Sequence, residues 1–320
     1  MVPFAFLSSL LLATLPLALG KPKCRDIPSG AITIGKNKSG GKYANITAAL
    51  ADTSSSIYYI YPGNYTEAVN ITRPVTIYGA TDDIYDYTAN RVTISRNMVA
   101  SVAGSDDLSG TVRVETAGVN LYNLNIENTY GKPVDQAQAI ALSVQAGPFA
   151  AYACQLRGYQ DTLYANKGAQ FYSKSLIQGS VDFIFGKTAS IWITDSTIKT
   201  DGDGCITASG RQTDDDYYYV IDHSTIVNTT YANYLGRPWR DYARVIFQNS
   251  YLGSNILPAG WSIWSDATPL IDNVTYGEYH NTGPGAWNPD RATFATLLTA
   301  PITIDTVLNS TSWIDSAYLK

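Results

Sequence analysis

Charged side chains are scarce in this chain of 320 residues, of which only 15% are Asp, Glu, Lys or Arg. Soluble domains typically carry about 25% charged residues, and disordered segments are poor in apolar ones. Here 45% of the residues are hydrophobic, which predicts a large buried core. The 22 basic and 27 acidic residues leave a net charge of −5, so nucleic acid and membrane surfaces are not expected partners.

Cysteine and histidine are also rare, which restricts disulfide, metal and serine-esterase chemistry. The three cysteines, Cys24, Cys154 and Cys205, lack metal-ligand spacing and are too few for a disulfide scaffold. At most one intrachain disulfide can form, and the sequence does not show which pair would form it. His223 and His280 fall in a strand repeat and a loop, where structural roles are expected. No Gly-x-Ser-x-Gly nucleophile motif occurs either.

Long apolar runs are missing except at the N-terminus. Residues 1–20 are apolar and end in Ala18-Leu19-Gly20, ahead of a polar start at Lys21. This pattern predicts a secretory signal peptide followed by one domain at residues 21–320, and the alternative of a membrane helix is disfavoured because the run is short and interrupted by proline. Seven Asn-x-Ser/Thr acceptors favour a secreted, extracellular glycoprotein: Asn37, Asn45, Asn64, Asn70, Asn228, Asn273 and Asn309.

Short strand-like runs dominate the rest of the sequence. Helical periodicity is confined to one candidate at residues 43–51, and from about residue 57 β-branched and aromatic runs alternate with Gly, Asn, Asp and Pro. Related runs recur about every 20 residues, at 151–156, 171–176 and 191–196. Such a period predicts a solenoid of stacked coils.

A right-handed, single-stranded parallel β-helix fits this all-β repeat best. Leucine-rich repeats have similar lengths, but their Leu/Asn framework is missing, and a jelly roll or sandwich would favour hairpin turns. Residues 282–320 break the pattern. In this region, residues 293–298 and 312–314 are expected to form a short helix or cap packed along the solenoid.

The repeat length brings particular polar residues together. Asp161 and Asp182 are 21 positions apart and Gln138 and Gln160 are 22 apart, so each pair is expected on adjacent strands, about 4.8 Å apart. Two carboxyls this close resist joint ionisation, which raises one pKa and lowers the other. Arg237 is a candidate to hold one carboxylate in a bidentate pair. Solvated turn acids or a calcium site are the alternatives, but the aromatic surroundings favour a functional pair.

Five segments resemble, in the same order, the signature segments of the pectin methylesterases (pectinesterases). The resemblance covers essentially the whole mature chain. It implies a parallel β-helix that removes methyl esters from the C6 carboxyl of galacturonate units in pectin and releases methanol, without a metal or an organic cofactor. The short, secreted fungal-type members are the most similar, and a monomer is expected. The segments are residues 63–67, 138–142, 158–164, 182–186 and 235–239.

The same resemblance implies a role for each matched residue. Asp182 would be the nucleophile, and Asp161 would act first as general acid and then as general base. Gln138 and Gln160 would donate hydrogen bonds to the oxyanion, while Arg237 would orient Asp182. Aromatic residues would line the sugar-binding groove: Tyr164, Phe185 and Trp239, joined by Trp261 or Trp264.

The sequence of a β-helix protein also allows other functions. A polygalacturonase or a pectin lyase would use the same architecture, and glycosidases also use paired carboxylates. The chain lacks the Gly-His-Gly and Arg-Ile-Lys segments of polygalacturonases. A carbohydrate-binding solenoid without activity would need only exposed aromatic residues, whereas the acid pair with an arginine points to catalysis.

Overall fold

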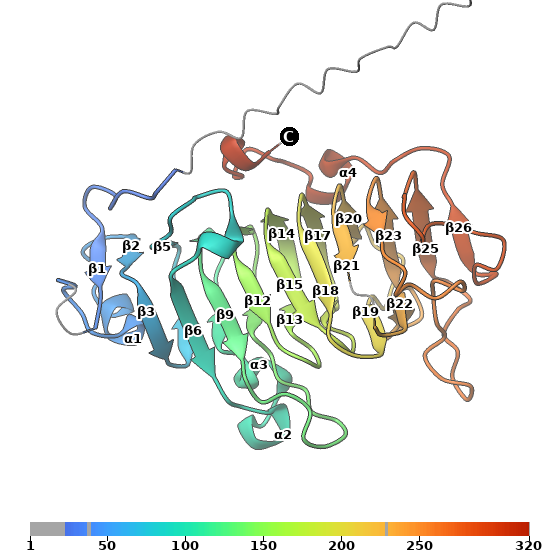
Figure 1. Cartoon of the computed structure of the whole chain (residues 1–320), viewed down its shortest axis with the longest axis horizontal. Coiled ribbons are helices and arrows are strands. Elements are labelled where there is room, and N and C mark those ends of the chain that lie inside the picture. Colours follow the sequence, from blue (N-terminus) through green and yellow to red (C-terminus); the bar gives the residue numbers. More distant parts are fainter. Residues whose placement is uncertain (1–22, 37–39, 228–229, 320) are drawn as a thin grey trace, which may run out of the picture.

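The computed structural model describes residues 23–36, 40–227 and 230–319. The expected signal peptide at residues 1–20 therefore lies outside the described residues. The described chain winds into one elongated solenoid, whose strands stack side by side along the long axis (Figure 1). All pairings between its named strands are parallel and connect adjacent coils. The right-handed parallel β-helix predicted from the 20-residue repeat is confirmed.

Three sheets, here called A, B and C, form the walls of the solenoid. Sheet A contains β1 (Ile32–Ile34), β2 (Ile57–Ile60), β5 (Thr76–Gly79), β8 (Val119–Tyr122), β11 (Phe149–Tyr152), β14 (Lys167–Ser173), β17 (Thr188–Thr194), β20 (Tyr219–Asp222), β23 (Arg244–Gln248), β25 (Thr275–Tyr279) and β26 (Ala295–Leu297). Sheet B contains β3 (Gly63–Thr66), β6 (Val92–Arg96), β9 (Asn125–Asn128), β12 (Gln155–Arg157), β15 (Leu176–Gly179), β18 (Thr197–Thr200), β21 (Thr225–Val227) and β24 (Tyr251–Leu252). Sheet C contains β4 (Val69–Ile71), β7 (Val112–Val114), β10 (Leu142–Val144), β13 (Leu163–Ala165), β16 (Ile184–Gly186), β19 (Gly204–Ser209) and β22 (Asn233–Pro238).

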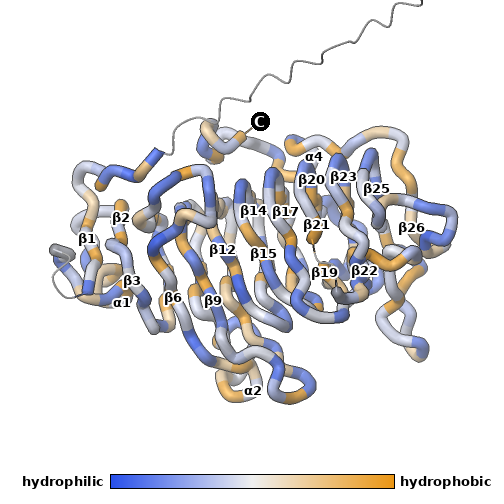
Figure 2. Tube along the Cα trace, in the orientation of Figure 1, coloured by the Kyte–Doolittle hydropathy of each residue, from blue (hydrophilic) through white to orange (hydrophobic). Residues whose placement is uncertain are grey.

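Equivalent residues of successive coils stack inside the solenoid. In sheet B one interior column runs through eight strands and is at most 2% exposed at every step. Hydrophobic stretches accordingly recur in each coil in Figure 2. Because each side chain packs on its counterpart in the next coil, the 20-residue period of the sequence is the period of the core. The column is Tyr65, Ile94, Ile126, Leu156, Ile177, Ile198, Ile226 and Leu252.

The turn from sheet A to sheet B repeats one backbone conformation. At this turn His223 and His280 adopt left-handed φ angles of 42° and 46°, as Asn249 does between them at 51°. At the position directly after this turn residue, serine hydroxyls link successive coils, and the backbone N–H of Ser196 donates to Ser224 Oγ at 3.2 Å. Both histidines therefore occupy repeated turn positions, in keeping with the structural roles expected for them.

Short helices occur near the two ends and in the connections before β6 and β7. Helix α1 (Ile46–Leu50) lies within the expected residues 43–51 and is capped by Asn45, whose side chain accepts from the backbone N–H of Ala48 at 2.8 Å. The others are α2 (Ala100–Ala103), α3 (Asp106–Ser109), α4 (Ile304–Leu308) and two 3₁₀ turns, η2 (Tyr87–Ala89) and η3 (Ser316–Tyr318). In the described part of the chain, none of these helices has the length and hydropathy needed to span a bilayer.

The C-terminal segment forms the expected cap, with one difference. Residues 293–298 contain strand β26 rather than a helix, because β26 pairs with β25 and continues sheet A. Helix α4 then contacts β14 and β17 on the outer face of sheet A (Figure 1). All three cysteines are free thiols, with Cys24 exposed and Cys154 and Cys205 buried.

The interior column of sheet B yields a test of the fold. Ile198→Ala removes a fully buried side chain from the middle of the column and should lower the free energy of unfolding by about 2–5 kcal/mol. Lys199→Ala, one position along the same strand on a partly exposed side chain, should change it by less than about 0.5 kcal/mol. Denaturant unfolding of both variants measures the difference, and equal losses would contradict the assigned register.

Candidate active site

Two acids occupy equivalent positions on adjacent coils, each two residues before a strand of sheet C, β13 and β16. Gln160 forms parallel bridges with Gln138 in one neighbouring coil and Val181 in the other. Asp161 follows Gln160, Asp182 follows Val181, and both acids adopt left-handed φ angles, of 64° and 50°. The two carboxyls are thus placed one above the other by the coil spacing, as the 21-residue separation suggested.

Arg237, on β22, grips one of these carboxylates. Its Nε lies 2.9 Å from Asp182 Oδ1 and its Nη2 lies 2.7 Å from Asp182 Oδ2. The guanidinium also lies over the Trp264 ring, 4.4 Å from the ring centroid. A bidentate pair of this kind fixes the orientation of the carboxylate, and it favours the ionised form.

The two acids differ because only Asp182 has the arginine. Burial raises the pKa of Asp161 well above its usual range, the charges of Asp182 and Asp106 raise it further, and Arg237 opposes them weakly. Burial also raises the pKa of Asp182, and the hydrogen bonds and charge of Arg237 offset this only in part, so the pKa of Asp182 is raised, but not as far as that of Asp161. The expected lowering of one of the two pKa values is therefore wrong, because burial acts on both carboxyls. The arrangement therefore favours a protonated Asp161 beside an ionised Asp182.

The two glutamines differ in burial and in their hydrogen bonds. Gln160 is 7% exposed, and its Oε1 accepts from the backbone N–H of Ala137 at 3.0 Å. That bond fixes the amide, and among the described residues the Gln160 Nε2 has no hydrogen-bond partner. Gln138 is partly exposed, and its Nε2 donates to Gln136 Oε1 at 2.9 Å. Gln160 is consequently the better ordered free donor beside the acid pair.

These side chains line a cleft of about 470 Å³. Phe185, Trp239 and Trp264 form its aromatic wall, and Trp239 meets the Phe185 ring edge-on with 6.0 Å between centroids. Tyr164 stacks behind Phe185, with ring centroids 4.4 Å apart, and supports that ring without lining the cleft. The full lining is Asp106, Lys132, Asp135, Gln136, Gln138, Gln160, Asp161, Val181, Asp182, Phe185, Ala208, Arg237, Trp239 and Trp264.

Comparison with known proteins identifies this arrangement. The Pectinesterase family model matches residues 31–307. A probable pectinesterase A of Aspergillus niger is 44% identical over 306 residues, which cover 91% of this chain and 90% of that protein. The chain belongs to the pectinesterase family. Membership makes it an enzyme of the carboxylic ester hydrolase class, and the family predicted from the five sequence segments is confirmed.

Solved structures of the family share the fold. The deglycosylated pectin methylesterase from Aspergillus niger superposes with a TM-score of 0.86 at 41% identity, covering 92% of this chain and 100% of that one. The pectin methylesterase from carrot superposes with a TM-score of 0.80 at 28% identity, covering 91% and 97%. The likeness therefore extends over nearly the whole β-helix.

Two of the residues expected to line the groove, Tyr164 and Trp261, do not line the cleft, and Trp261 lies in the core of this pectinesterase-family chain. It is 1% exposed and stacks on Tyr276 with ring centroids 4.2 Å apart. Its indole N–H donates to Glu278 Oε1 at 3.1 Å, and Glu278 is itself paired with buried Arg291. The bridge from Trp261 to Gly236 places it at an inward-facing position of sheet C, so Trp264, three residues later, is the tryptophan that reaches the cleft.

Several cleft residues were not found by sequence reasoning. Asp106 comes from α3, an insertion that has no counterpart in the 20-residue repeat. Lys132 and Asp135 belong to the irregular segment between β9 and β10. Repeat spacing cannot place such residues, since it only relates positions within regular coils. No group of three or more His, Cys, Asp or Glu side chains suited to a metal occurs in the described parts of the chain.

The different environments of the two acids predict opposite effects of the same substitution on stability. The pKa of Asp161 is higher in the folded chain than in the unfolded one, so its carboxyl opposes folding above the unfolded pKa of about 3.9. Asp161→Asn should therefore stabilise the protein at neutral pH by roughly 1–2 kcal/mol. The gain should vanish as the pH falls below the unfolded pKa.

Asp182→Asn is the matched control, because an amide cannot form the charged pair with Arg237. The pKa of Asp182 is also raised in the folded chain, but this variant leaves the partly buried Arg237 guanidinium without its charged partner, which is costly. Its unfolding midpoint in urea should therefore not rise. Stabilisation of the same size in both variants would show that Arg237 does not distinguish the two carboxyls.

Proposed function

We propose that the protein hydrolyses methyl esters at the C6 carboxyl of galacturonate units in pectin, with Asp182 as the nucleophile. The observation that carries this proposal is the Asp182–Arg237 pair beside buried Asp161 on the cleft wall. The relatives named pectinesterase and pectin methylesterase support the substrate class. No metal or organic cofactor takes part in the proposed reaction.

The first half of the reaction forms an acyl-enzyme. A carboxylate oxygen of Asp182 attacks the ester carbonyl carbon, and negative charge develops on the carbonyl oxygen. Gln160, with Gln138 beside it, donates hydrogen bonds to that oxygen, which is the kind of stabilisation that lowers acyl-transfer barriers most. The tetrahedral intermediate then expels the methoxy group, which takes the proton of Asp161 and leaves as methanol.

The second half restores the enzyme. Asp161, now ionised, removes a proton from water, and the resulting hydroxide attacks the acyl carbon. The bond between the acyl carbon and Asp182 breaks, which frees the Asp182 carboxylate and leaves the galacturonate unit with a carboxylic acid at C6. Asp161 is again protonated. One water is consumed and one methanol released per turnover. The first half needs a protonated Asp161 beside an ionised Asp182 at one pH, and the second half returns both groups to those states. The single arginine beside Asp182 supports this difference.

The aromatic wall suits a sugar chain. Phe185, Trp239 and Trp264 present ring faces and edges to the cleft, and such surfaces pack against the apolar faces of pyranose rings. Trp264 also covers the outer side of the Arg237 guanidinium, which reduces its access to water. This shielding strengthens the attraction between Arg237 and Asp182.

We further propose that residues 1–20 are a signal peptide, that residues 21–320 form the secreted catalytic domain, and that it acts as a monomer. Five of the seven glycosylation acceptors lie among the described residues, and all five are exposed, as export and glycosylation require. They are Asn45, Asn64, Asn70, Asn273 and Asn309. The other two, Asn37 and Asn228, lie outside the described residues.

The roles predict a graded set of losses in methanol release from methylated pectin. Asp182→Ala and Asp161→Ala should each abolish it while the far-UV circular dichroism stays that of the wild type. Gln160→Ala should lower kcat by about 100- to 1000-fold, since one oxyanion donor is lost. Asp290→Ala, at an exposed acid outside the cleft, should be silent.

Analysis of the wild-type products tests the reaction class at the same time. Methanol and acidification indicate an esterase, new reducing ends indicate a hydrolase of the chain, and absorbing unsaturated ends indicate a lyase. Wild-type turnover by the Asp182 or Asp161 variant would refute the assigned roles.

A further inference from the structure

One carboxylate in the cleft has no part in the reaction described above. Asp106, at the start of α3, lines the cleft together with Asp161 and Asp182. Among the described residues its side chain has no hydrogen-bond or ion-pair partner. The charge of Lys187 lowers the pKa of Asp106, while the larger effect of burial raises it. The carboxylate of Asp106 thus faces the cleft without a hydrogen-bond or ion-pair partner among the described residues.

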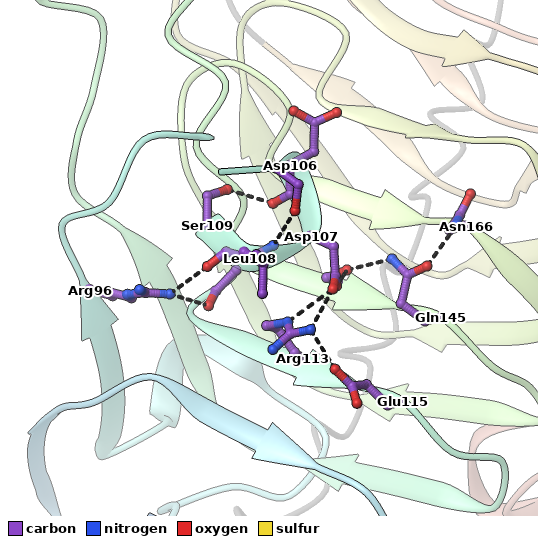
Figure 3. A network of polar contacts seen from close by, with 12 residues as sticks. Arg96, Asp106, Asp107, Leu108, Ser109, Arg113, Glu115, Gln145 and Asn166 are labelled. Atoms are coloured by element: carbon purple, nitrogen blue, oxygen red, sulfur yellow. Dashed lines mark hydrogen bonds and ion pairs between the residues drawn. The ribbon is translucent and has the colours of Figure 1, made fainter. Parts of the chain in front are cut away.

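The helix that carries Asp106 is held firmly in place. Its N-cap Ser105 accepts from the backbone N–H of Leu108 at 3.1 Å, and Arg96 donates to the backbone oxygens of Leu108 and Gly110. Figure 3 shows this network beneath α3, with the Asp106 carboxylate directed away from it. Asp106 therefore cannot retreat from the cleft by a movement of α3 without breaking these bonds.

Its sequence neighbour, Asp107, shows the contrast. Asp107 accepts from Arg113 Nε at 3.1 Å and from the hydroxyl of Ser143 at 2.7 Å, so it ties α3 to β7 and β10 (Figure 3). Both oxygens of the Asp107 carboxylate therefore have partners within the protein. Of the two adjacent acids, Asp107 holds α3 in place, whereas the charge of Asp106 is available to act on a ligand in the cleft.

A polymeric substrate brings more than one sugar unit to this site. The cleft lining is drawn from coils that run from α3, just before β7, to Arg237 on β22. Successive coils are about 4.8 Å apart, so a chain lying along them places units on both sides of the reacting ester. A neighbouring unit on the α3 side then lies against Asp106. That unit is neutral if methylated and carries a negative charge if it is not.

We propose that Asp106 is a specificity-determining residue that disfavours a free galacturonate carboxylate beside the reacting ester. Like charges brought together across a cleft are costly, and built-in repulsion is a common source of selectivity. The enzyme consequently prefers an ester whose neighbour is still methylated. This inference rests on the proposed function, because it assumes a pectin chain in the cleft.

The test compares two substrates at neutral pH and low salt. One is a fully methyl-esterified oligogalacturonide, and the other is the same oligomer after random removal of some of its esters. Asp106→Asn should raise kcat/KM per ester on the second substrate about tenfold, since the repulsion is removed. On the first substrate the change should be much smaller, because an uncharged neighbour experiences no such repulsion. Loss of the Asp106 charge also acts on the pKa of Asp161, but that effect is common to both substrates and cancels in the ratio of their kcat/KM values.

Asp135→Asn is the matched control, since it removes the same charge from an exposed position of the same cleft. An equal shift in both variants would show that net charge, and not Asp106, sets the preference. An equal change of Asp106→Asn on both substrates, or no change on either, would also overturn the proposal. Absence of methanol from the wild type on both substrates would instead refute the proposed function.

The salt dependence of the wild type provides a second test, which does not depend on whether a variant folds. Salt screens repulsion between charges near the surface, so the preference of the wild type for the fully esterified substrate should shrink as ionic strength rises. A wild type with no preference at low salt would contradict the role given to Asp106.

Discussion

The two hydrogen bonds from Arg237 to Asp182 decide how the cleft works. Asp161 and Asp182 are chemically the same, share one wall and are both buried. Burial alone would push both toward the protonated form. Because one guanidinium lies against Asp182 alone, the two environments differ, and a protonated and an ionised carboxyl can exist side by side at one pH, as the proposed reaction requires.

The solenoid makes this arrangement accessible. Gln160 and Val181 share one bridge position, so the acids that follow them are stacked by the backbone itself. The tight left-handed conformation of both acids turns their side chains out of the strand direction at equivalent points. Rigid columns of buried residues such as Ile177 and Ile198 stand behind these coils and fix the spacing.

Much of this follows from the sequence wherever residues belong to the repeat. The 21-residue separation of Asp161 and Asp182 was enough to pair them, because residues that are one coil length apart in the sequence lie opposite each other on adjacent coils. Arg237 needed a chemical argument, since longer coils separate it from Asp182. Trp261 and Trp264 could not be told apart without knowing which one faces inward, and Asp106 sits in an insertion that no period describes.

The most direct test of the account is the ionisation state of the two acids in the resting enzyme. Carboxyl ¹³C chemical shifts of aspartate-labelled protein, assigned with the Asp161→Asn and Asp182→Asn variants, report it at each site. At neutral pH the account predicts a carboxylate shift for Asp182 and a carboxylic-acid shift for Asp161. Two carboxylate shifts, or the reverse assignment, would contradict it.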